Sequence, residues 1–189
     1  MTESWRCFVA VPIGETLREA LVDAVERWRA RPDLDGLRWS NPGGWHVTLA
    51  FLGAVEADAI PDIRASIADV AAASQPLELE AGRVGGFPSA RRARVAWYGV
   101  ADPDGALAEV AARLRDALGL DAVAPFRPHL TLGRARGEPV DLSAWREAAD
   151  EPSGILEVTG VELMRSHLGR GPARYEIIGS MPLGAPAHV

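Results

Sequence analysis

The chain has 189 residues, 48% of them hydrophobic, which is enough for one domain with a substantial core. Its formal net charge of −6 argues against a general nucleic-acid binder, and its single cysteine, Cys7, excludes an internal disulfide. No stretch approaches the roughly 20 apolar residues that a membrane span needs, and the N-terminus lacks a cleavage-site pattern. We therefore expect a cytoplasmic protein without membrane contacts, with Cys7 as a buried hydrophobic residue.

The first half of the chain alternates between segments of strand and of helix character. Apolar and β-branched runs predict the strands, and apolar residues at helical spacing predict the helices. Thr16 and Glu19 form a capping-box pattern at the start of the first helix. The expected elements are a strand at 6–13, a helix that ends before Pro32, a loop at 37–44, a strand at 45–53, a helix at 57–73 and a strand at 75–84.

The second half repeats this order. The expected elements are a strand at 94–100, a helix at 104–118, a strand at 126–134, a short helix at about 142–149, a strand from about 155 to 164 and a last strand at 173–181. The repetition suggests an ancient duplication about a pseudo-twofold axis. We expect a single bilobed domain over 1–189, with duplicated halves at about 6–84 and 94–182 and the passage between them in GGFPSARR, residues 85–92.

Two of the predicted strands carry the same motif, since they read WHVTLAFLG and FRPHLTLGR. Successive side chains of a strand point to opposite faces, so His46 shares a face with Thr48, and His129 shares a face with Thr131. The residues between and after them, Val47 and Leu49 in the first motif and Leu130 and Leu132 in the second, point to the opposite face, toward the core. With five threonines in the chain, two such coincidences have a chance on the order of one in a few hundred.

If the two motif strands face each other, two imidazoles and two hydroxyls converge on one point. Histidine titrates near neutrality, so one imidazole can accept a proton while the other donates one. Hydrolysis of a phosphodiester needs both roles, a base for the attacking oxygen and an acid for the departing one, and each is typically worth about 10²–10⁴ in rate. Threonine hydroxyls and nearby arginines would hold the phosphate oxygens.

Metal binding is the competing use of the two histidines. It fits poorly, because threonine is not a usual ligand and neither motif stretch contains a carboxylate. The sequence contains no GxSxG motif, partnered cysteine, P-loop or dinucleotide fingerprint. We therefore expect neither a metal nor a cofactor.

Acidic residues are absent from four separate stretches of the chain. Residues 36–55, 81–101, 122–137 and 163–175 contain no Asp or Glu, yet they carry 11 of the 20 arginines and three of the four histidines. If folding brings these stretches together, an acidic protein has one positive cleft, suited to an anionic substrate of limited size. The alternative is that the acids simply gather on exposed helix faces.

The two histidine motifs, the opening RCFVAVPI, the GGFP before RVAWYGV and the ending VELMRSHLGRGPARYEII together resemble the two-histidine phosphoesterase superfamily. Within it, the chain is most similar to the bacterial and archaeal RNA 2′,3′-cyclic phosphodiesterases, historically called 2′-5′ RNA ligases. This resemblance covers nearly the whole chain. It implies an α+β, bilobed, pseudo-twofold fold with antiparallel sheets that line a central cleft and helices outside. It also implies metal-independent opening of a terminal 2′,3′-cyclic phosphate to a 2′-phosphate, with 2′-5′ RNA ligation as the reverse reaction.

The resemblance also implies roles for residues of the two motifs. It makes His46 the proton donor and His129 the proton acceptor, and it assigns Thr48 and Thr131 to phosphate binding. The residues themselves leave the donor and acceptor roles open, because a symmetric pair can exchange them between the forward and reverse reactions.

Which arginine contacts the phosphate stays open as well. The resemblance marks Arg134, whereas strict alternation places Arg127 on the face of His129 and Arg134 on the core side, unless a bulge at Gly133 turns Arg134 inward. Alternation also predicts that Phe51 is a core residue rather than a platform for a nucleobase.

Two other functions remain open from the residues alone. One is a binding module for RNA ends or nucleotides that no longer catalyses a reaction, and the other is a phosphodiesterase for small cyclic nucleotides such as an ADP-ribose cyclic phosphate. The expected partners are RNA ends or small nucleotides with a 2′,3′-cyclic phosphate, because the basic content is too modest for a long duplex. Nothing in the sequence suggests an oligomer, so we expect a monomer.

Overall fold

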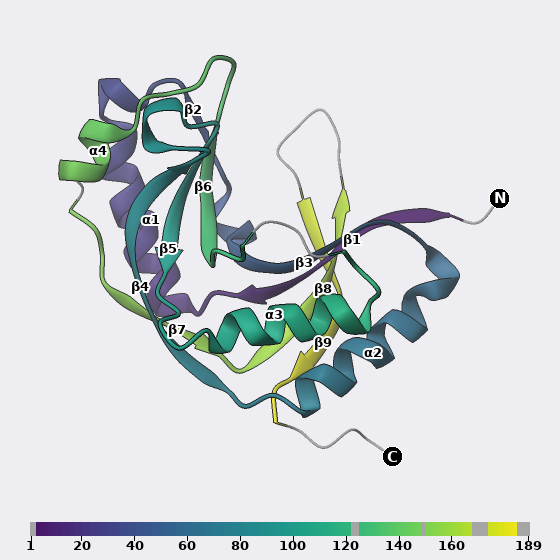
Figure 1. The fold of residues 1–189 in the computed structure, drawn as a ribbon. Coiled ribbons are helices and arrows are strands. Elements are labelled where there is room, and N and C mark those ends of the chain that lie inside the picture. The colour runs from purple at the N-terminus through teal and green to yellow at the C-terminus, as the bar shows by residue number, and fades with distance from the viewer. Residues whose placement is uncertain (1–2, 122–124, 149, 168–173, 185–189) are drawn as a thin grey trace.

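The computed structural model describes residues 3–121, 125–148, 150–167 and 174–184 (Figure 1). Its strands are β1 (Ser4–Pro12), β2 (Leu37–Trp39), β3 (His46–Glu56), β4 (Leu77–Phe87), β5 (Val95–Val100), β6 (His129–Ala135), β7 (Gly154–Val158), β8 (Gly160–His167) and β9 (Arg174–Pro182). Its α-helices are α1 (Glu15–Arg29), α2 (Ile60–Ala72), α3 (Ala106–Ala117) and α4 (Ser143–Ala148). Short 3₁₀ turns precede β2, β3, α2 and β5.

The strands form one antiparallel sheet in the order β7-β4-β5-β6-β3-β1-β8-β9, and β2 pairs with the end of β6. The two strands that carry the histidine motifs, β3 and β6, are neighbours at the centre of this order. They join through a single residue pair, Val47 with Leu130, so each motif strand belongs mainly to its own half of the sheet. The fold is therefore α+β with a curled antiparallel sheet, as predicted (Figure 1).

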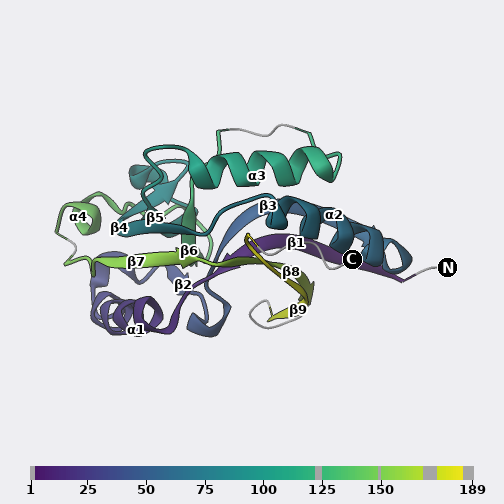
Figure 2. The same cartoon turned by 90° about the horizontal axis from the view of Figure 1, so that it is seen from below.

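The helices cover the outside of the sheet. Helix α3 packs against α2 and β3, and α2 extends over β8 and β9, whereas α1 packs against β7 and α4 against β4. Figure 2 shows α2 and α3 together on one side of the molecule and α1 on the other. The helical spacing predicted for the first helix is confirmed, because Leu17, Leu21 and Trp28 are buried. The motif leucines Leu130 and Leu132 are also fully buried, so the opposite face of each motif strand is left for the cleft.

Three local predictions were wrong. Helix α1 begins at Glu15 with Gly14 as its N-cap, so Thr16 already lies inside the first turn and cannot form a capping box. The loop at 37–44 contains β2, because β6 offers its edge to these residues. The strand expected at about 155–164 is two strands, β7 and β8, which pair in opposite halves of the sheet.

The strand order bears on how the two sequence halves are arranged. Strand β4 follows the first histidine motif in the chain yet pairs with β5, and β8 follows the second motif yet pairs with β1. The residues GGF of the GGFPSARR stretch belong to β4, which confines the turn to the residues after Phe87. A duplication with boundaries near 6–84 and 94–182 stays a prediction; under it, each half lends a strand to the sheet of the other.

Within the described residues, no helix is long and apolar enough to cross a membrane.

Candidate active site

A cleft of about 830 Å³ opens where the two halves of the sheet meet. Each of the four acid-free stretches of the sequence contributes residues to its lining. The arginines that line it are Arg6, Arg38, Arg115, Arg127 and Arg134. Among the described lining residues, Asp121 is the only carboxylate. The prediction of a cleft rich in positive charge on an acidic protein is therefore confirmed.

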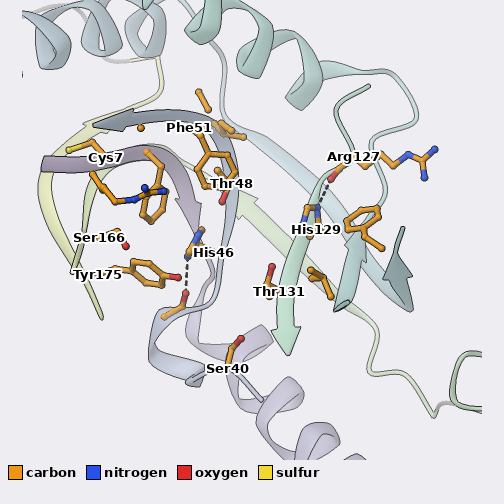
Figure 3. Close-up of a pocket in the computed structure, with 18 of the residues that line it drawn as sticks. Cys7, Ser40, His46, Thr48, Phe51, Arg127, His129, Thr131, Ser166 and Tyr175 are labelled. Atoms are coloured by element: carbon orange, nitrogen blue, oxygen red, sulfur yellow. Dashed lines mark hydrogen bonds between the residues drawn. The ribbon is translucent and has the colours of Figure 1, made fainter. Parts of the chain in front are cut away.

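The two histidines are held in the same way. The ring Nδ1 of His46 lies 2.7 Å from the carbonyl oxygen of Gly44, and Nδ1 of His129 lies 2.7 Å from the carbonyl oxygen of Arg127 (Figure 3). A carbonyl only accepts hydrogen bonds, so both Nδ1 atoms carry a proton and donate it. This leaves Nε2 of each ring as the nitrogen that can exchange a proton with a ligand.

The register between the motif strands places each threonine beside the histidine of the other strand. Because Val47 pairs with Leu130 in an antiparallel sense, His46 lies nearest Thr131 and Thr48 lies nearest His129. In Figure 3 both hydroxyls point toward the space between the imidazoles. Two hydroxyl donors and two Nε2 atoms therefore surround one position that a tetrahedral anion can occupy.

Aromatic side chains pack against both imidazoles and partly bury them. The ring of Phe8 stacks on His46 at 4.8 Å between centroids, Tyr175 packs edge-on against His46 at 5.1 Å, and Phe87 packs edge-on against His129 at 4.9 Å. This burial is the main cause that lowers the pKa of both histidines, and the hydrogen bonds to the backbone carbonyls oppose it. The charge of His129 lowers the pKa of His46 further, so the empty site disfavours two imidazolium ions.

A bulge in β3 turns Phe51 into the cleft. Two consecutive residues of β1 pair with Ala50 and Thr48, so Leu49 between them has no partner on β1. Leu49 and Ala50 are both buried, so the alternation of faces restarts after them. Phe51, predicted as a core residue, is 73% exposed and lines the cleft (Figure 3). That prediction was wrong because it assumed an unbroken strand.

Strand β6 has a bulge at the corresponding position, and this bulge turns Arg134 toward the cleft. Strand β5 pairs with Thr131 and Gly133 at consecutive positions, which leaves Leu132 over, and Leu132 and Gly133 are both buried. Arg134 therefore emerges on the cleft side, and its charge lowers the pKa of His129. Five residues after each histidine, one strand thus presents a phenyl ring and the other a guanidinium group.

Each bulge frees a carbonyl oxygen, and a different donor satisfies it. The carbonyl of Leu132 accepts a hydrogen bond of 2.8 Å from the backbone N–H of Ser40. The carbonyl of Leu49 accepts one of 3.3 Å from Nη1 of Arg115, whose guanidinium lies 6.0 Å from the centroid of Phe126. The two bulges are therefore fixed from outside their own strands.

The two candidate arginines differ in direction. Arg127 lines the cleft rim, but in Figure 3 its guanidinium points away from both histidines, while its carbonyl holds His129. Arg134 lies directly across from Arg38 of β2, a residue that the sequence analysis did not consider. Like charges at directly opposite positions destabilise a sheet, so this pair favours an anion between them. Its place in the acid-free stretch 36–55 was the one signal in the sequence that Arg38 could line the cleft.

Two other sequence expectations concern residues near the cleft. Cys7 is 2% exposed and belongs to the core, as predicted. His167 lies outside the cleft lining and pairs with Glu176 at 2.8 Å. In the part of the chain that the structure describes, no three His, Cys, Asp or Glu side chains are grouped so that they can hold a metal ion.

The curled antiparallel sheet and the two histidine–threonine strands at its centre define the class: this is a two-histidine phosphoesterase fold. The family model described as the 2′-5′ RNA ligase superfamily matches residues 17–170. The chain belongs to this superfamily, so the resemblance stated from the sequence is confirmed.

Curated relatives carry the name RNA 2′,3′-cyclic phosphodiesterase. The protein of Geobacillus stearothermophilus is 32% identical over an alignment of 189 positions, which covers 95% of this chain and 58% of the relative. The protein of Archaeoglobus fulgidus is 30% identical over an alignment of 172 positions, which covers 88% of this chain and 94% of the relative. The chain thus spans somewhat over half the length of the first relative and nearly all of the second.

Solved structures show the same fold. The chain matches E. coli LigT in complex with 3′-AMP with a TM-score of 0.71 at 25% identity, over 97% of this chain and all of that one. It matches TT0787 of Thermus thermophilus with a TM-score of 0.77 at 25% identity, over 96% of this chain and 100% of the other.

Proposed function

We propose that this protein hydrolyses a terminal 2′,3′-cyclic phosphate of RNA to a 2′-phosphate, without a metal, by acid–base catalysis between its two histidines. The observation that carries this proposal is the matched pair of imidazoles, each with Nδ1 bound to a carbonyl and Nε2 left free. The curated name of the relatives supports the same reaction. The phosphate lies between the two Nε2 atoms, within reach of Thr48 and Thr131.

The difference between the two strands orients the substrate. Phe51 offers an exposed ring on the β3 side on which a nucleobase can stack, and Arg134 and Arg38 offer positive charge at the β6 and β2 side. The nucleoside therefore occupies the half of the cleft near His46 and Phe51. The non-bridging phosphate oxygens face Arg134.

This orientation assigns the proton transfers. Water attacks phosphorus and gives its proton to Nε2 of neutral His129, the P–O3′ bond breaks, and O3′ takes a proton from Nε2 of charged His46. The leaving O3′ belongs to the ribose on the side of Phe51, which places His46 beside it. The charge of Arg134 favours neutral His129, as a base requires. A 5′-hydroxyl that attacks phosphorus in place of water, with the same P–O3′ bond broken, gives 2′-5′ ligation through the same groups in the same roles.

The direct test uses an RNA that ends in a 2′,3′-cyclic phosphate, incubated with the protein in excess EDTA. We expect a product with a 2′-phosphate at a rate that EDTA does not change, because the histidines carry the proton transfers. Chromatography against 2′- and 3′-phosphate standards identifies the product. A cyclic end that survives, or turnover that requires an added divalent ion, contradicts the proposal.

A small cyclic nucleotide is the second candidate substrate. The net charge of −6 and the limited size of the cleft favour it over a long RNA. An ADP-ribose cyclic phosphate compared with an RNA end under one salt condition separates the two. Tight binding of both without turnover would instead indicate a module that only binds nucleotide ends. The intact histidine and threonine pairs argue against such a module.

The rate should show a bell-shaped dependence on pH. The pH of its maximum depends on the burial of the two histidines, because burial lowers the pKa of each. Burial lowers the pKa of both His46 and His129 from the ordinary 6.5. Activity falls at low pH as the base becomes protonated, and at high pH as the acid loses its proton. Because kcat/KM reports the free enzyme, its maximum should lie below the ordinary histidine pKa. The bound phosphate favours imidazolium, so the maximum of kcat should lie at higher pH. Initial rates across the titration range measure both, and coincident maxima contradict the assignment.

A further inference from the structure

The cleft continues past Phe51, away from the histidines. Its lining extends along β3 to Gly53 and along β1 to Arg6, which pairs with the residue after Gly53. The opposite wall there consists of Leu120, Asp121, Pro125, Phe126 and Arg115, which lie in and after α3. A nucleoside whose phosphate lies between the histidines and whose base lies on Phe51 does not fill this end.

Among the described residues, none pairs with the side chain of Arg6 at this end of the cleft. Arg6 lies two residues before Phe8 on β1, on the same face, opposite Ser166 of β8, which also lines the cleft. Its side chain is exposed, and no hydrogen bond or ion pair with another described residue engages it. Arg115, the other arginine at this end, is already bound to the carbonyl of Leu49 and packed on Phe126.

The neighbouring arginine on β8 shows what a satisfied guanidinium looks like here. Arg165 points to the other face of the sheet, where it bonds Glu3 at 2.6 Å and lies 4.1 Å from the ring of Trp5. In the described part of the chain, no carboxylate pairs with Arg6 and no ring lies against its guanidinium as they do for Arg165. A guanidinium that lines a binding cleft without a protein partner can bind an anionic group of the ligand.

We propose that Arg6 binds the phosphodiester on the 5′ side of the terminal nucleotide, so that this end of the cleft is a subsite for the preceding nucleotide of an RNA. This inference rests on the proposed function. The 2′,3′ edge of the ribose faces the histidines and the 5′ carbon lies at the opposite edge of the sugar, so the RNA chain leaves the site toward Arg6. The apolar side chains of the opposite wall, Leu120, Pro125 and Phe126, then receive the preceding nucleoside.

Such a subsite makes the enzyme prefer an RNA end over a mononucleotide. One additional charge-assisted contact is worth about tenfold in kcat/KM, which a nucleoside 2′,3′-cyclic phosphate cannot obtain because it has no second phosphate. The additional contact also adds to the salt dependence, by a slope of about 0.7 for one phosphate of a single strand.

The test compares a dinucleotide that ends in a cyclic phosphate with the mononucleoside cyclic phosphate of the same base. Wild-type protein should prefer the dinucleotide by about tenfold in kcat/KM. Arg6→Ala should remove this preference and leave the mononucleoside value within about twofold, and Arg6→Lys should restore part of it. Arg92→Ala, at an exposed arginine outside the cleft lining, is the matched control and should keep the preference.

Binding of the 2′-phosphate-terminated dinucleotide, measured by titration, tests the subsite independently of turnover. Arg6→Ala should weaken it by about tenfold and should not weaken binding of the nucleoside 2′-phosphate. Equal losses on both ligands, or no loss on either, overturn the subsite. If wild-type protein hydrolyses neither substrate, the proposed function fails, and the two binding constants still decide whether Arg6 reads the second phosphate.

Discussion

Replacing either His46 or His129 by alanine should lower kcat for the cyclic phosphate by about 10²–10⁴, because in the proposed mechanism each Nε2 carries one of the two proton transfers. The fold should survive, since both rings are only partly buried and water can occupy the freed carbonyls of Gly44 and Arg127. His167→Ala removes an imidazole that pairs with a carboxylate outside the cleft, and its rate should stay near that of the wild type.

Joint removal of the two catalytic rings should cost far less than the product of the single losses, because both act in one chemical step. The measurement compares the steady-state rates of the wild type, the two single variants and the double variant, and circular dichroism checks that each is folded. If either single variant keeps more than about a tenth of the wild-type kcat, that imidazole is not a proton carrier in the reaction.

The two roles can be told apart with a leaving group that needs no acid. In a cyclic phosphate with sulfur at the 3′ position, the departing thiolate has a far lower proton affinity than an alkoxide, since a thiol titrates near pH 8.5. We expect this substrate to restore turnover to His46→Ala and not to His129→Ala. The opposite pattern would exchange the donor and the acceptor.

The face that each proposed catalytic histidine shares with its threonine follows from short-range geometry, and for that reason the sequence predicted it. A strand repeats every two residues, so the spacing from His46 to Thr48 and from His129 to Thr131 determines one shared face without knowledge of the partner strands. The leucines at the alternate positions were predicted as buried for the same reason, and Leu130 and Leu132 are.

Phe51 and Arg38 could not be placed in this way, because non-local pairing decides where they lie. The bulge that turns Phe51 outward exists only relative to β1, whose register does not show in the motif itself. Arg38 becomes a cleft residue only because β2 pairs with the end of β6 and brings it opposite Arg134. The lobe in which β4 and β8 pair is likewise a long-range outcome: β4 was predicted as a strand, whereas β8 was merged with β7 into one expected strand.

Substitution of Arg134 by alanine should have the largest effect of any arginine variant, about 10²–10³ in kcat/KM, because its guanidinium can stabilise the charge that develops on the phosphate oxygens. Arg127→Ala should change the rate only a few-fold, since the guanidinium of Arg127 points away from the histidines and its carbonyl, which holds His129, is kept in the variant (Figure 3). Arg134→Lys should recover part of the loss because it keeps the positive charge. The recovery should be incomplete because lysine cannot form the bidentate contact.

The pH profile adds a second readout that a merely structural role for Arg134 would not move. The charge of Arg134 lowers the pKa of His129, so its removal should raise that pKa and shift the acid limb of kcat/KM toward higher pH. Arg127→Ala should leave the limb in place. Inhibition by inorganic phosphate should weaken in parallel for Arg134→Ala alone. If Arg127→Ala instead causes the larger loss and the shifted limb, the bulge in β6 does not bring Arg134 to the phosphate, and the arginine on the face that strict alternation selects holds it.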